Sequence, residues 1–219
     1  MFSYTVFAMI EGATGSLRAS VSEKLLDLLI SGHVPPGRIN ESELARRIKV
    51  SRTPLREALV ALESAGFVLS QERGFAIPVL RSIEIRETYP IIASLETLAL
   101  ETAGIPDRTQ IQELTRINRE FRRVARKPLE ALNVDGRFHD ILLRGCPNTR
   151  LMNLISRQKL LVRRYELLYF RETRFFERSA EQHDEIINFL ASRDMARSVA
   201  VLKSNWTCAL HLLMWSVRD

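Results

Sequence analysis

The stretch from Asn40 to Leu59 constrains the fold most, because it has the pattern of two short helices joined by a tight turn. Asn40 is a favourable N-cap, and Glu43 three positions later completes a capping-box pattern. Lys49-Val50-Ser51 suits the turn that follows. Apolar residues then recur at three- and four-residue steps, as on the buried face of a helix: Leu55, Ala58, Leu59, Leu62 and Ala65.

The second helix of this pair carries two arginines away from its apolar face. Arg52 and Arg56 are four residues apart, Thr53 lies beside them, and Pro54 suits the first helical turn. A cationic pair at the exposed start of a second helix is the geometry with which a helix-turn-helix enters the DNA major groove. The alternative is a solvated helix face with no ligand.

A β-hairpin is predicted directly after this helix pair. Phe67–Ser70 and Phe75–Val79 are short β-favouring runs, and Gln71–Gly74 between them places glycine where a positive φ is expected. Arg73 lies at the tip, within reach of a phosphate or of the minor groove. A further helix with Leu17, Val21, Leu25, Leu28 and Leu29 on one face precedes the pair. Residues 16–80 are therefore predicted to form a winged helix-turn-helix domain, after an N-terminal tail of residues 1–15 with no assigned role.

Beyond residue 81 the pattern is helical throughout, so the fold is predicted to be mainly α. Pro128, Pro147 and the pairs Pro106-Asp107 and Arg193-Asp194 interrupt the helical periodicity, and Asn148 and Asp194 suit N-caps. Residues 81–219 are expected to form an all-α bundle of six helices, at Ile83–Glu101, Thr109–Lys127, Leu129–Arg144, Thr149–Tyr169, Arg178–Ser192 and Met195–Val217.

Polar residues occupy apolar positions on three of these helices. Asp135 and His139 lie on one stripe of the third helix, His183 lies among isoleucines on the fifth, and Asn205 lies on the apolar side of the last. A buried polar group without a partner costs about 1–3 kcal/mol, so each of them needs one. A carboxylate and two imidazoles that face one another would suit a divalent metal. One Asp135–His139 hydrogen bond beside an unrelated core histidine would explain the same residues.

The composition agrees with a polyanionic partner. The formal net charge is +6 and the pI is about 9.7. Cys146 and Cys208 follow no pairing motif, and no apolar run approaches the ~18 residues of a membrane span, so a cytoplasmic protein without membrane contact is expected.

The first domain resembles the DNA-binding half of GntR-type transcriptional regulators. The resemblance rests on Pro-Pro-Gly, Glu-Ser-Glu-Leu-Ala, Val-Ser-Arg-Thr-Pro-Leu-Arg-Glu-Ala-Leu and Arg-Gly-Phe-Ala. It implies a regulator that binds a palindromic operator as a homodimer, with Arg52, Thr53, Arg56 and Gly74 at positions that touch DNA. Ser42 stands where many relatives carry arginine. The predicted DNA-binding set is Ser42, Ser51, Arg52, Thr53, Arg56, Arg73 and Gly74.

The second domain is similar to the FadR C-terminal domain, or FCD, of the FadR subfamily. The pattern is Asp135-Gly-Arg-Phe-His139 followed by Gln182-His183-Asp-Glu-Ile. It implies a metal at Asp135, His139 and His183 beneath a small carboxylate effector. Asn205 replaces a fourth ligand that is histidine in relatives, and Ile92 replaces an arginine that faces the effector pocket. Because asparagine is a weaker ligand for zinc or nickel than imidazole, manganese and magnesium are candidates too. Asn205 and Ile92 complete the predicted effector pocket.

A ligand-responsive transcriptional regulator is the function predicted from both halves. One alternative is a metal-dependent enzyme that uses Asp135, His139 and His183, although the chain has no nucleophile motif, HExxH or phosphate-binding glycine loop. The other is a DNA-binding protein without effector control. The protein is therefore predicted not to be an enzyme.

Overall fold

The computed structural model describes residues 21–22, 24–25, 28–29, 33–64, 66–79, 81–170 and 173–216. The chain divides into two compact units, Met1–Leu80 and Arg81–Asp219, and each is described by itself. The predicted N-terminal tail, together with Leu17 of the first predicted helix, lies outside the described residues. Helix covers most of the described residues and a small sheet accompanies it there, so the mainly α fold class is confirmed.

The first helix of the pair in the first unit begins at its predicted cap, Asn40. α3 spans Glu41–Ile48 and α4 spans Arg52–Ser64. The Asn40 side chain accepts a hydrogen bond from the Glu43 backbone N–H at 3.2 Å, and Lys49 ends α3 in the left-handed conformation at φ 59°. Leu44 and Ile48 of α3 and Leu55 and Leu59 of α4 are buried, so the apolar stripes hold the two helices together.

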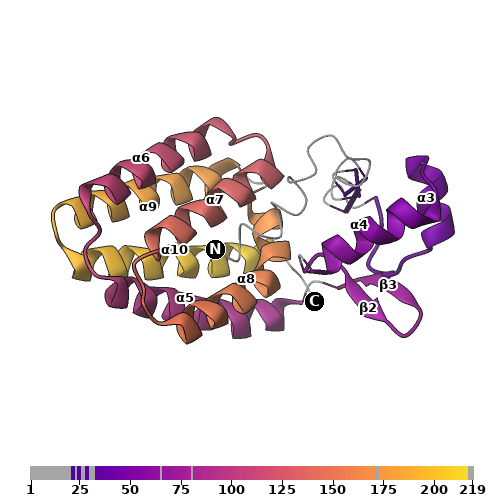
Figure 1. Cartoon of the computed structure of the whole chain (residues 1–219), viewed down its shortest axis with the longest axis horizontal. Coiled ribbons are helices and arrows are strands. Elements are labelled where there is room, and N and C mark those ends of the chain that lie inside the picture. Colours follow the sequence, from indigo (N-terminus) through magenta and orange to yellow (C-terminus); the bar gives the residue numbers. More distant parts are fainter. Residues whose placement is uncertain are drawn as a thin grey trace. The chain divides into compact units, whose positions relative to one another are not determined.

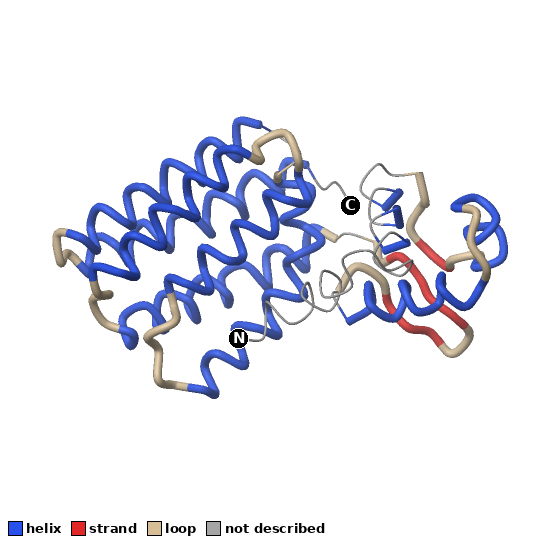
Figure 2. Tube along the Cα trace, turned by 45° about the horizontal axis from the view of Figure 1, so that its top comes forward, coloured by secondary structure: helices blue, strands red, loops and turns tan. Residues whose placement is uncertain are grey.

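The wing is an antiparallel sheet beside α4, with its strands drawn in red in Figure 2. β2 spans Leu69–Gln71 and β3 spans Gly74–Ile77, which confirms the predicted hairpin. Gly74 has φ +89°, where a side chain would be strained. A further strand, β1 at Gly37–Arg38, pairs with the other edge of β3, with Arg38 opposite Ala76, and was not predicted.

The second unit is a helical bundle whose members lie alongside one another in Figure 1. α5 packs against α8 and α10, while α6 packs against α7 and α9. The predicted caps are confirmed: Asn148 accepts from the Leu151 N–H and Asp194 from the Arg197 N–H, each at 3.0 Å. The helices are α5 Ser82–Ala103, α6 Arg108–Arg123, α7 Pro128–Leu142, α8 Thr149–Tyr169, α9 Thr173–Ala191 and α10 Met195–Ser216.

Two predicted helix boundaries differ from the structure by four residues or more. α9 begins at Thr173 and not at Arg178, because Phe175 and Phe176 are buried in the bundle and continue the apolar face of α9 toward its N-terminus. α6 ends at Arg123, where turns lead to Pro128. None of the helices in the described ranges is long and apolar enough to cross a membrane.

Candidate DNA interface and metal centre

The structure places the predicted DNA-binding residues on the surface of the first unit. Arg52, Thr53 and Arg56 lie in the first turns of α4 and are exposed, as is Ser51 just before them. Arg73 is exposed in the two-residue turn of the wing, next to Gly74. The helix start and the wing tip therefore both present cations to solvent.

Two adjacent residues of α3 hold the two arginines. The Ser42 hydroxyl accepts a hydrogen bond from the Arg52 guanidinium. Glu41 pairs with Arg56, its Oε2 lying 3.1 Å from Arg56 Nε, and a Cβ added at Gly74 would lie 2.9 Å from Glu41 Oε1. Glu41 thus lies against both α4 and the wing. These contacts of Glu41 were not predicted, because acidic residues are common in the first turn of a helix, where they interact favourably with the helix dipole.

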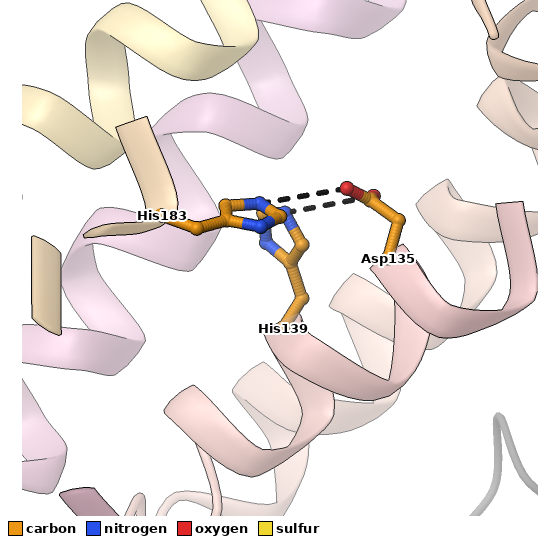
Figure 3. Close-up of side chains that lie close together, drawn as sticks. All are labelled: Asp135, His139 and His183. Carbon is orange, nitrogen blue, oxygen red and sulfur yellow. Dashed lines mark ion pairs between the residues drawn. The ribbon is translucent and has the colours of Figure 1, made fainter. Parts of the chain in front are cut away.

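Within the bundle, the three predicted metal ligands lie together. Asp135 and His139 come from α7 and His183 comes from α9, and Figure 3 shows both imidazole rings beside the Asp135 carboxylate. His183 Nε2 lies 3.5 Å from Asp135 Oδ1, and His139 Nε2 lies 3.8 Å from Asp135 Oδ2. One ligand atom from each residue falls within 4.8 Å of the others. All three side chains are buried.

Each histidine is held at its other ring nitrogen. His139 Nδ1 lies 2.6 Å from Glu96 Oε2 on α5, and the same oxygen accepts from the Trp206 indole at 2.9 Å. His183 Nδ1 lies 3.1 Å from Asn118 Oδ1 on α6. Both rings therefore turn Nε2 toward Asp135, which is the arrangement that a hydrogen-bond partner at the opposite nitrogen imposes on metal-binding histidines.

Burial and neighbouring charges shift the pKa values of several groups in the site. Burial raises the pKa of Asp135, and although His139 and Lys159 oppose the change, the result is about 6. Burial also raises the pKa of Glu96, but the charges of His139 and Lys159 outweigh it and bring the value to about 2. Lys159 Nζ lies 3.2 Å from Glu96 Oε1 and 3.1 Å from Asp140 Oδ1. Burial lowers the pKa of His183 well below its ordinary value, so this imidazole is neutral.

The remaining predicted pocket residues are buried but differ in their contacts. Ile92 on α5 is fully buried and apolar. Asn205 on α10 donates from its Nδ2 to Gln182 Oε1 at 3.1 Å, which satisfies its amide donor outside the three-residue cluster. Glu96 and Asn118 were missed by sequence reasoning, although each stands on an apolar helix face, and that signal would have found both.

Known families cover both units of the chain. Residues 17–76 match the family described as bacterial regulatory proteins, gntR family, and residues 87–206 match the FCD domain. The chain belongs to the GntR family of transcriptional regulators and carries an FCD domain, an architecture consistent with the FadR subfamily. Its relatives are regulators and not enzymes, as predicted.

Similar proteins are found among both sequences and structures. The Nta operon transcriptional regulator of Aminobacter aminovorans is 34% identical over 173 residues, which is 76% of this chain and 80% of that protein. The uncharacterized HTH-type transcriptional regulator YdhC of Bacillus subtilis is 29% identical over 74% of this chain and 75% of its own. The structure of Escherichia coli McbR/YncC has a TM-score of 0.67 at 20% identity, over 92% of this chain and 98% of that one, and shares the fold.

Proposed function

We propose that this regulator binds a palindromic operator as a homodimer, and that a small carboxylate effector, held by a divalent cation in the bundle, modulates its DNA affinity. It would act in the cytoplasm, where its operator lies. The observation that carries the proposal is the buried group of Asp135, His139 and His183, which combines with an exposed pair of arginines in one chain.

The DNA interface is supported by the exposed cations of α4 and the wing. Arg52 and Arg56 would enter the major groove with the start of α4, while Arg73 would contact the backbone from the wing. Guanidinium groups are suited to this role, because they form bidentate hydrogen bonds with guanine and phosphate. Ser42 would orient Arg52, from which it accepts a hydrogen bond, rather than contact a base directly.

The cation site is supported by a buried ring nitrogen that faces the Asp135 carboxylate. His183 Nε2 is fully buried and has no hydrogen-bond partner in the described part of the chain, and it faces the Asp135 carboxylate. A lone pair opposite an ionised carboxylate is repulsive unless a proton or a cation lies between them, and a divalent cation would bind His139 as well. Two nitrogens and one oxygen suit zinc or nickel, whereas Asn205 in place of a fourth imidazole favours manganese or magnesium.

The effector site is supported by a buried hydroxyl close to the cation ligands. Tyr89 on α5 is only 1% exposed and its Oη has no hydrogen-bond partner in the described chain. Its ring packs edge-on against Trp206, which also packs against His139. A cation bound by three protein ligands keeps positions open for a carboxylate, and a polar group of the same molecule would satisfy the Tyr89 hydroxyl.

The homodimer is supported by apolar side chains that α5 and α8 leave exposed. Ile83, Ile91 and Leu98 on α5 recur at seven- and eight-residue steps, and Leu154 and Leu161 on α8 are seven apart. Each of these five side chains is between 45% and 51% exposed. Because α5 and α8 pack against each other, a second copy could cover both stripes at once.

The experiment that tests this function begins with operator selection from a random DNA pool, followed by footprinting. A two-fold symmetric footprint and a dimer by light scattering are expected, and Leu161→Glu should yield monomers with weaker operator binding. Small carboxylates titrated into the metal-loaded protein should then change operator affinity in the wild type and not in His139→Ala. If neither metal nor any carboxylate tested changes the affinity for DNA, effector-independent DNA binding is the correct function.

A further inference from the structure

Asn118 of α6 is a buried amide whose orientation is fixed by its partners. Its side chain is 1% exposed. Its Nδ2 donates to the Ala180 carbonyl oxygen at 3.0 Å and to Asp184 Oδ1 at 2.6 Å, both on α9. A carbonyl and a carboxylate only accept hydrogen bonds, so the amide nitrogen must face them. The amide oxygen must therefore face the other way, toward His183.

The orientation of this amide decides which nitrogen of His183 carries the proton. Asn118 Oδ1 can only accept, so His183 Nδ1, 3.1 Å away, must donate. Phe138 stacks on the imidazole at a centroid distance of 3.7 Å and an angle of 13°, which holds the ring plane. In the neutral ring the lone pair then lies on Nε2, the atom that faces Asp135 Oδ1 at 3.5 Å.

We infer that Asn118 is a positioning residue that fixes His183 as an Nε2 ligand for the cation. The inference rests on the proposed cation site and adds to it a residue that touches no ion itself. Glu96 has the matching position behind His139. The two ligands thus have different supports, a neutral amide for His183 and a carboxylate for His139.

The contacts behind His183 continue to the surface of the bundle. Asp184, which accepts from Asn118 through Oδ1, accepts from Arg122 through Oδ2 at 2.6 Å. Arg122 also donates to the Ala180 carbonyl at 3.1 Å. Arg122 therefore joins α6 to the same two residues of α9 as Asn118 does. The Arg122 and Asp184 side chains are 43% and 50% exposed. The tautomer of a buried ligand is therefore maintained by a chain of contacts that ends in solvent.

Two substitutions separate the positioning role from a role in joining the helices. Asn118→Leu removes the acceptor for His183 and both donors to α9. Asn118→Asp keeps an acceptor for His183 but also loses the donors. If Asn118 only joins α6 to α9, the two variants should behave alike. If it positions His183, only Asn118→Leu should change the tautomer.

The test uses the full chain with two readouts. Long-range ¹H–¹⁵N NMR of the metal-free protein reports the His183 tautomer, and competition titration with zinc reports cation affinity. The wild type and Asn118→Asp should show the Nδ1–H tautomer, whereas Asn118→Leu should lose it and bind zinc about 10- to 100-fold more weakly. Arg144→Ala, which breaks a different contact of α6, the one with Glu113, should leave both readouts unchanged.

A single Nδ1–H tautomer and wild-type zinc affinity in Asn118→Leu would overturn the inference. If Asn118→Leu does not fold, Asn118→Ala replaces it, because alanine also lacks the acceptor for His183 Nδ1 and should lose the single Nδ1–H tautomer. A wild-type protein that binds no zinc would refute the zinc site, while the NMR readout would still decide whether Asn118 fixes the tautomer.

Discussion

The first turns of α4 and the centre of the bundle both gather charged and polar side chains, but they differ in their access to water. The Arg56 side chain is 61% exposed, whereas His183 and Glu96 are fully buried. At the surface a charge is solvated and free to meet a polyanion. In the interior each polar group must be matched by another group of the protein or by a ligand.

The contrast explains why the two sites need different supporting contacts. Arg52 and Arg56 are held lightly, by Ser42 and Glu41, and an exposed ion pair is worth only about 0–1 kcal/mol. These contacts can therefore exchange for DNA at little cost. The imidazoles of the bundle are held by Glu96 and Asn118, which cannot be exchanged without leaving buried groups unpaired.

The largest effect is expected from removal of a buried ligand. His139→Ala should abolish cation binding, because it removes one of the three ligand side chains of the cluster. It should leave basal operator affinity within about twofold, since the substitution lies in the other unit. Calorimetric titration with zinc, paired with operator binding by fluorescence anisotropy, checks both halves. Parallel loss of operator binding would mean that the two units are not separable in this way.

Removal of a surface arginine should have a smaller effect in the other unit. Arg52→Ala or Arg56→Ala should each weaken operator binding by about 1–3 kcal/mol through loss of a base or phosphate contact. Zinc affinity should not change. Arg46→Ala, which removes an exposed arginine of α3, is the matched control. Unchanged operator affinity at fixed salt in both α4 variants would show that α4 is not the recognition helix.

Asn205→His tests the site from the opposite direction, by adding an imidazole. Since imidazole is a better ligand than an amide for zinc and nickel, we expect affinity for these ions to rise by about tenfold, the usual size of a change in the ligand environment. The cost is the Asn205–Gln182 hydrogen bond. Asn205→Leu loses the same bond without adding a ligand and serves as the control. Equal affinities in the two variants would place residue 205 outside the coordination sphere.

The wing should contribute affinity without sequence preference. Arg73→Ala should weaken binding to operator and to random DNA by similar factors, because a phosphate contact carries no sequence information. The slope of log K against log salt should become shallower by about one unit. Binding measured at four salt concentrations gives this slope. A loss confined to the operator would assign Arg73 to base recognition instead.

A modest pH effect is expected in the bundle of the metal-free protein. Burial raises the pKa of Glu166 to about 7, and the nearby charge of Asp135 adds to the increase. The folded state then holds this proton more tightly than the unfolded state, so its stabilising effect is complete below about pH 4.5 and is lost as the pH rises through 7. The contribution of Glu166 should therefore favour a higher unfolding temperature at pH 5.5 than at pH 7.5. Glu166→Gln should reduce that difference, and an unchanged difference would remove Glu166 from its causes.

Local signals were enough to predict most of the fold. Asn40, Asn148 and Asp194 have the caps that their sequence positions suggest, because capping depends on neighbours within three residues. β1 at Gly37–Arg38 was missed because its pairing with β3 depends on residues about 40 positions away. The early start of α9 was missed because buried aromatic residues, and not a cap, determine it.

The ligands of the candidate site could be predicted from the sequence, but the residues that hydrogen-bond to the two histidines could not. Asp135, His139 and His183 were identified because polar residues interrupt apolar stripes, and the structure brings all three together. Glu96 and Asn118 interrupt such stripes as well, yet which histidine each would meet depends on how α5 and α6 pack against the rest of the bundle. Helix packing is not encoded in any one stripe, so the hydrogen bonds could not be assigned from sequence.

The most direct test of the buried cation site is a calorimetric titration of the full-length wild-type protein with zinc, manganese and nickel, after chelator treatment and dialysis. Elemental analysis of protein purified without chelator accompanies it. The arrangement of Asp135, His139 and His183 predicts one ion per chain and a clear heat of binding for at least one of the three metals. No bound metal and no heat with any of them would contradict it, and would leave Asp135, His139 and His183 as a buried polar cluster without a cation.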